Sequence, residues 1–105
     1  MTDKRIALTT TASKDEGQKI ARVLVEQRLA ACVNVVGPVG STYSWLGRVE
    51  QSTEYLLIIK TTAAAAGRVQ EAIRKVHSYK VPEFVVLNIE DGSPEYLKWI
   101  GESVG

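Results

Sequence analysis

The residues of this chain that could hold a metal ion are few. The 105 residues contain one histidine, His77, and one cysteine, Cys32, while the acidic residues are scattered. Imidazole and thiolate are ligands that copper and zinc favour. Pro82 restricts the preceding residue to extended backbone, which fixes the entry to the last predicted strand and lets the Glu83 carboxylate face a cleft. With so few donors, a Cys/His zinc site within one chain is excluded.

Each of these residues also has a structural interpretation. Cys32 follows Ala31 at the start of a strand, where a free cysteine is usually a small buried hydrophobe. His77 follows the second predicted helix, where an imidazolium would interact favourably with the last carbonyl groups. Glu83 could form an ion pair with Lys60 at a strand edge, which contributes little when exposed. Both interpretations stay open for each residue.

A second group of candidates is aromatic. Tyr43 and Trp45 lie near the turn of a predicted hairpin, and we interpret them as filling a contact with another chain, since aromatic residues anchor interfaces. A ligand platform is the alternative. Tyr79 and Lys60 are assigned to a cleft between subunits. Trp99 lies on a predicted amphipathic C-terminal helix, where it would anchor the core or an interface.

The hairpin that carries the aromatic pair is unusually long. Residues 32–45 and 48–61 are rich in β-branched and aromatic residues, with Leu46-Gly47 as the turn and Gly37-Pro38-Val39-Gly40 as a bulge or bend in the first arm. Such arms extend for roughly 40 Å at about 3.3 Å per residue. A globule of this length has a radius of gyration of only ~13 Å. The hairpin must therefore project beyond the core, and its exposed edges predict an obligate oligomer.

The remaining pattern predicts a single domain over residues 1–105. In chain order the expected elements are a strand over residues 6–11, a helix from the capping box Ser13–Glu16 to Arg28, the hairpin, a helix capped by Thr62, a strand over residues 81–89 and a helix that starts at Ser93-Pro94. The order β-α-β-β-α-β matches the ferredoxin-like α+β arrangement, with helices on one face of an antiparallel sheet and a further C-terminal helix.

Composition excludes several classes of function. The net charge of +1 and the dispersed Lys and Arg residues argue against nucleic-acid binding. Residues 29–47 carry no charge, but glycine, proline and polar residues interrupt them, so no membrane span is expected. The N-terminus leads into a strand without the apolar region of a signal peptide, which predicts a cytosolic protein. No nucleophile–base constellation or phosphate-binding loop is visible, so an enzyme is not expected.

Five segments resemble the CutA divalent-cation-tolerance family, in the same order and at compatible spacing. They are residues 30–34 (AACVN), 41–47 (STYSWLG), 57–61 (LIIKT), 77–83 (HSYKVPE) and 96–100 (YLKWI). The resemblance implies a homotrimer with interlocking hairpins, similar in architecture to PII signalling trimers. It also implies a response to metal ions, with copper or another divalent cation bound weakly by His77 together with Cys32 or Glu83 and residues of a neighbouring chain.

The resemblance leaves a second function open and includes two departures. The alternative is a PII-like signalling trimer whose clefts between subunits bind a small ligand or a partner protein through Lys60, Arg48, Tyr79 and Trp45. This chain has Thr9 where some members of the family carry a cysteine, and Val76 before His77 where some carry paired histidines. Tight copper binding is therefore not expected.

Overall fold

The computed structural model describes residues 2–105; Met1, the first residue of the predicted domain, lies outside them. The elements are β1 (Lys4–Thr11), α1 (Lys14–Glu26), β2 (Cys32–Trp45), β3 (Arg48–Thr62), α2 (Ala66–Val76), β4 (Val85–Asn88) and α3 (Pro94–Ser103). The four strands form one antiparallel sheet in the order β2-β3-β1-β4. This is the predicted ferredoxin-like α+β fold with an added C-terminal helix.

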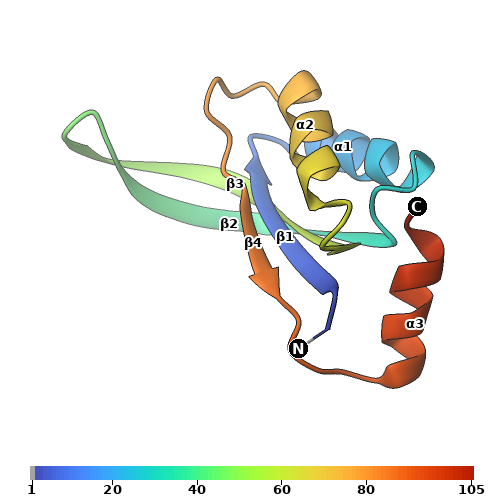
Figure 1. Cartoon of the computed structure of the whole chain (residues 1–105). Coiled ribbons are helices and arrows are strands. Elements are labelled where there is room, and N and C mark those ends of the chain that lie inside the picture. Colours follow the sequence, from blue (N-terminus) through green and yellow to red (C-terminus); the bar gives the residue numbers. More distant parts are fainter. Residues whose placement is uncertain (1) are drawn as a thin grey trace.

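The core lies between α1 and α2 and one face of the sheet, as Figure 1 shows. The apolar stripe of each helix recurs at helical spacing and is buried on the sheet, for example at Ile20 and Leu24 of α1 and Ile73 of α2. Leu57 and Ile59 of β3 meet these side chains from the sheet. Burial of a side chain of this size stabilises the fold by about 1.5–3 kcal/mol.

The opposite face of the sheet is also apolar. Side chains alternate between the two faces of a strand, and Ala7 of β1 points to the helices, so Leu8 points away from them. Leu8 pairs with Ile58 of β3 and with Val85 of β4, and these residues share its face. Figure 1 shows α1 and α2 together on the other side of the sheet. We call this surface, formed by Ile6, Leu8, Val36, Leu56, Ile58, Val85 and Leu87, the open sheet face.

The predicted hairpin is confirmed and projects from the body (Figure 1). The molecule is 43 Å long but only 25 and 22 Å in its other dimensions. Leu46 and Gly47 both have positive φ, as in the type I′ turns that match the twist of a hairpin. The bulge falls between Val36 and Val39, where the pairing register shifts. Gly37 is needed there, because a Cβ would lie 2.6 Å from the ring of Tyr55.

Two predicted boundaries are wrong. The second helix begins at Ala66, because Thr62 is the last residue of β3 and its hydroxyl accepts from the Ala65 amide in an intervening turn. The last strand is only Val85–Asn88, and its pairing with β1 ends at Leu8. Residues 77–84 instead form a loop, which we call the 77–84 loop. Pro82 has no amide hydrogen for a strand ladder.

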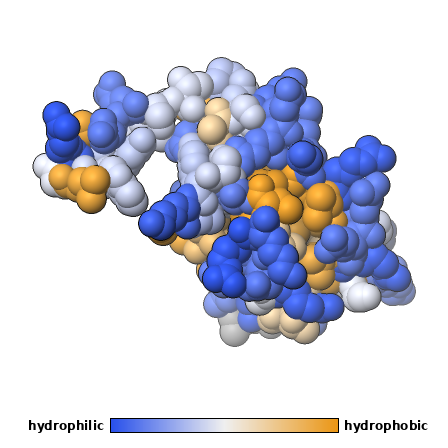
Figure 2. Space-filling view, turned by 90° about the horizontal axis from the view of Figure 1, so that it is seen from above, coloured by the Kyte–Doolittle hydropathy of each residue, from blue (hydrophilic) through white to orange (hydrophobic). Residues whose placement is uncertain are grey.

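The surface is mostly hydrophilic when seen from above, with one hydrophobic patch on the body and a small one at the end of the hairpin (Figure 2). Leu46, at the turn, is 84% exposed. Within residues 2–105, no helix combines the length and the apolar character needed to cross a bilayer.

Candidate functional site

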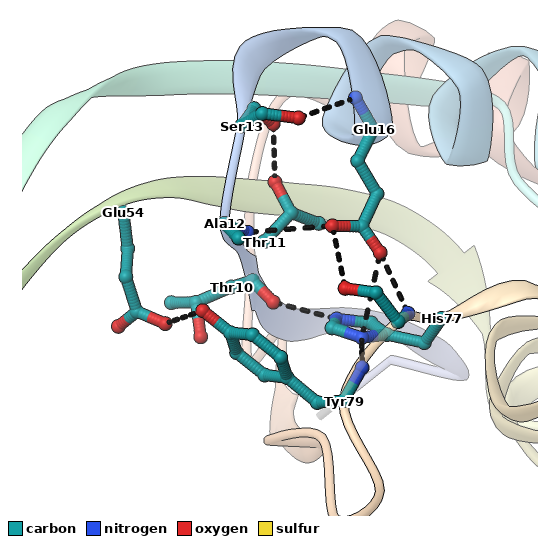
Figure 3. Close-up of polar contacts among 9 residues, drawn as sticks. Thr10, Thr11, Ala12, Ser13, Glu16, Glu54, His77 and Tyr79 are labelled. Carbon is teal, nitrogen blue, oxygen red and sulfur yellow. Dashed lines mark hydrogen bonds and ion pairs between the residues drawn. The ribbon is translucent and has the colours of Figure 1, made fainter.

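His77 lies where α2 ends and binds the end of β1 (Figure 3). Its Nε2–H donates to the carbonyl oxygen of Thr10 at 2.7 Å, and its Nδ1 accepts from the Tyr79 amide at 3.0 Å. This pair of partners requires the neutral tautomer with the proton on Nε2. The side chain is completely buried. Both ring nitrogens thus hold the main chain. Thr10 lies beyond the end of the β4 pairing, and on that side its carbonyl accepts from His77 instead of from β4.

Glu16, in the first turn of α1, joins that helix to the 77–84 loop (Figure 3). Its carboxylate accepts from the amide of Ser78 at 2.7 Å and from the Ser78 hydroxyl at 3.0 Å. Partial burial opposes ionisation, but these hydrogen bonds prevail and lower the pKa of Glu16. The capping prediction is confirmed for Ser13, whose hydroxyl accepts from the Glu16 amide. The return bond goes to the amide of Ala12, one residue earlier than in a capping box.

A groove of about 780 Å³ lies between the hairpin and the 77–84 loop. Its lining residues are Thr10, Ser41, Thr42, Tyr43, Trp45, Glu54, Ser78, Tyr79, Lys80, Val81 and Glu83. The phenol of Tyr79 reaches across from the loop and donates to Glu54 Oε2 at 2.7 Å (Figure 3). Burial, together with the carboxylate of Glu54, raises the pKa of Tyr79 to about 12. The volume lies within the range of small-molecule sites, and the lining combines three aromatic residues with polar and charged ones.

The groove brings together four of the residues selected from the sequence, namely Tyr43, Trp45, Tyr79 and Glu83. The hairpin supplies the first two from β2, where positions 43 and 45 share one face of the strand. The sequence analysis did not select Glu54. Glu54 pairs with Val39, directly after the bulge. A bulge interrupts the alternation of side chains between the two faces of a strand, so the sequence did not show which face Glu54 occupies.

The other selected residues lie outside the groove. Cys32 pairs with Lys60 across β2 and β3, and the ammonium of Lys60 contacts the side chain of Asn34. The Lys60–Glu83 ion pair considered above is not among the ion pairs formed by residues 2–105. Trp99 lies half-exposed on α3, with its ring 5.4 Å from that of Tyr96.

The donors proposed for a metal ion do not converge within the chain. No group of three or more His, Cys, Asp or Glu residues suited to a metal occurs in the described part of the chain. Glu83 lines the groove, Cys32 lies at the start of β2, and His77 is bonded to the main chain. Thr9 of β1 is buried, and its hydroxyl has no hydrogen-bond partner among residues 2–105.

Comparison with known proteins gives one consistent result. Residues 5–103 match the CutA1 divalent ion tolerance protein family. The divalent-cation tolerance protein CutA of Thermus thermophilus is 43% identical over 102 residues, which cover 97% of this chain and 99% of that protein. Its solved structure matches with a TM-score of 0.95.

Relatives from other organisms also carry the CutA name. The CutA homolog of Xenopus laevis is 46% identical over 98 residues; these cover 93% of this chain, which spans only 65% of that longer protein. The solved structure of the periplasmic divalent cation tolerance protein CutA from Archaeoglobus fulgidus has a TM-score of 0.94 and 36% identity, and the match covers 97% of this chain and 99% of that one.

Proposed function

Since the chain belongs to the CutA1 divalent ion tolerance family, we propose that it is a homotrimeric, non-enzymatic protein of the response to divalent metal ions. Its relatives are named for tolerance of such ions rather than for a reaction. The observation that carries the assembly is the open sheet face, which is apolar and on which Val85 and Leu87 remain about half-exposed.

The physical argument for a trimer has two parts. Val85 and Leu87 of β4 are 45% and 49% exposed on the open sheet face, although large aliphatic side chains are usually buried. The projecting hairpin adds a second surface, because β2 forms one edge of the sheet. An edge strand with unpaired main-chain groups favours pairing with another chain. In a trimer, each chain would bury its open sheet face and its edge strand β2 against the neighbouring chains.

Sedimentation equilibrium of the purified protein tests this assembly. We expect the mass of three chains down to nanomolar dilution, because obligate interfaces are large and apolar. Leu87→Lys should lower the mass, since it places a charge on the open sheet face. Val25→Lys is the matched control, because Val25 is a similarly exposed valine on α1. A stable folded monomer of the unmodified chain would contradict the proposal.

Metal binding in this proposal is weak and uses accessible donors. Cys32 is partly exposed and Glu83 is exposed, so each could contribute one ligand to an ion completed by water or by a neighbouring chain. His77 could join only by giving up its hydrogen bonds to Thr10 and Tyr79. A cation that must displace such bonds gains little net free energy.

Calorimetric titration of the trimer with copper and with zinc measures these roles. We expect weak copper binding that Cys32→Ser reduces at least about tenfold, because a soft thiolate is lost. Glu83→Gln should have a smaller effect, and His77→Gln should leave copper binding unchanged. Loss of binding in His77→Gln, with the trimer intact, would make His77 a ligand and overturn its assignment to the main chain.

The groove supports a second candidate function, that of a signalling trimer with small-ligand clefts. Tyr79 and Trp45, selected for this role from the sequence, line it, whereas Arg48 and Lys60 do not. The groove presents a phenol, an indole and carboxylate groups, and such a set of polar and aromatic groups can orient a small ligand. A thermal-shift panel of metabolites and nucleotides tests this candidate. A panel without any ligand that raises the unfolding temperature would leave only the metal-response role.

The compartment also stays a proposal. A single free cysteine suits a reducing cytosol, where disulfides are rare. The Archaeoglobus fulgidus relative is described as periplasmic. Fractionation of cells that express the protein from its own gene would distinguish the two compartments.

A further inference from the structure

The carboxyl group of Glu54 forms no ion pair within residues 2–105. Its side chain lies at the groove with only 8% of the residue exposed. Its one hydrogen bond comes from the neutral phenol of Tyr79 (Figure 3). Buried carboxylates are normally paired or bound to a cation, because desolvation of a lone charge is costly.

The second oxygen of this carboxylate is available to a ligand. Oε1 of Glu54 accepts no hydrogen bond from the described residues, since the bond from Tyr79 goes to Oε2. Oε1 is also not fully enclosed by protein. Among residues 2–105, the only side-chain oxygen that is both fully enclosed and without a hydrogen-bond partner is Oγ1 of Thr9. The groove is therefore the space from which Oε1 can be reached.

The other walls of the groove favour the same kind of ligand. Tyr43 and Trp45 are both exposed on the hairpin, and aromatic faces attract organic cations. Glu83 adds a second carboxylate, against the single ammonium of Lys80. A bare divalent ion would gain nothing from aromatic walls and would need about six oxygen ligands. A guanidinium or alkylammonium group can use the carboxylates and the rings together.

We infer that the groove between the hairpin and the 77–84 loop binds a small organic cation, with Glu54 as its counter-ion and Trp45 and Tyr43 as its aromatic walls. This inference rests on the second candidate function and not on the metal proposal. The volume of about 780 Å³ accommodates a small molecule rather than a single ion.

Calorimetric titration of the assembled protein with agmatine, which carries a guanidinium and an ammonium, tests the inference. ATP and magnesium are titrated in parallel as an anion and as a bare divalent cation. Glu54→Gln keeps the shape and can still accept from Tyr79, but it lacks the charge. Glu90→Gln is the matched control, because Glu90 is exposed and does not line the groove. Trp45→Ala removes one aromatic wall of the groove.

We expect saturable agmatine binding that Glu54→Gln and Trp45→Ala each weaken about tenfold or more and that Glu90→Gln leaves unchanged. We also expect Glu54→Gln without ligand to unfold at the same or a higher temperature, because a buried charge without a counter-ion does not stabilise the fold. Binding of ATP but not agmatine at the groove would overturn the inference of an organic cation, while the second candidate function, a small-ligand cleft, would stand. If neither binds, the organic-cation inference is overturned, and the thermal-shift panel decides separately on the ligand cleft. A lower unfolding temperature of Glu54→Gln would mean that the assembly itself supplies the counter-charge, which also overturns the inference.

Discussion

At the scale of single residues, two buried threonines on the helix side of the sheet have opposite roles. Thr61 of β3 donates its hydroxyl to the carbonyl of Leu29 at 2.7 Å. Thr9 of β1 is equally buried but has no hydrogen-bond partner within residues 2–105. A buried hydroxyl without a partner keeps the full desolvation cost. The same residue type therefore stabilises the fold at one position and destabilises it at the other.

Thr9→Val should raise the free energy of unfolding by about 1 kcal/mol, because it replaces an unsatisfied hydroxyl with a methyl group of similar size. Thr61→Val is the matched control and should lower it by a similar amount, because the Leu29 carbonyl loses its donor. Urea unfolding of the assembled protein at one fixed chain concentration measures both. Equal destabilisation by the two substitutions would show that Thr9 has a partner in the assembly.

His77 illustrates how a residue with metal chemistry can be used structurally. Both of its nitrogens hold main-chain groups, at Thr10 and Tyr79, which are far apart in the sequence. The neutral imidazole supplies one donor and one acceptor, and no other side chain offers both on one small ring. The ring therefore closes the end of β1 and orients the loop that carries Tyr79 to the groove.

At the scale of elements, the 77–84 loop is fixed by helix and sheet contacts rather than by a ladder of its own. Glu16 of α1 binds Ser78, and Tyr79 binds Glu54 of β3. These contacts explain why the predicted strand does not start at Val81, which is 71% exposed. The wall of the groove thus depends on a few polar contacts, one of which titrates in the acid range.

Wild-type protein should lose stability in acid faster than Glu16→Gln. The folded state lowers the pKa of Glu16 below its ordinary value of 4.5, so this contribution is present above pH 4.5. It is lost as the pH falls through the lower folded value. Urea unfolding between neutral pH and about pH 3 should show the two curves converging in acid. Parallel curves over this range would mean that the contacts of Glu16 with Ser78 do not stabilise the loop.

At the scale of the whole molecule, the chain leaves apolar surface exposed. Helices α1 and α2 cover one side of the sheet, while Val85 and Leu87 on the open sheet face are about half-exposed and the hairpin projects from the body (Figure 1). A chain of this size can bury only a small core by itself. Assembly would bury the second apolar face, so folding and association are expected to be coupled.

The midpoint of urea unfolding should therefore rise with chain concentration, because mass action favours the assembled state. Measurement over a hundredfold range of concentration gives the coupling directly. Leu87→Lys should reduce both the midpoint and its dependence on concentration, whereas Val25→Lys should change neither appreciably. A midpoint that does not vary with concentration would show that the single chain is stable alone.

The sequence by itself determined the order of the elements and the family. Periodicity and turn residues act locally, so the hairpin with its Leu46-Gly47 turn, the bulge at Gly37-Pro38 and the caps at Ser13 and Ser93 could be predicted. The sequence did not predict boundaries that depend on pairing with a distant strand. Thr62 extends β3 because Lys4 of β1 pairs with it, and no local signal reports that partner.

Only the tertiary structure decided what the candidate residues do. It assigned the nitrogens of His77 to Thr10 and Tyr79 and separated Cys32 from Glu83. It also placed Glu54, which forms no ion pair with the described residues, beside the aromatic residues of the hairpin. These are contacts between residues far apart in the chain. Hydrogen bonding and burial depend on position in space, and composition or spacing along the chain does not specify them.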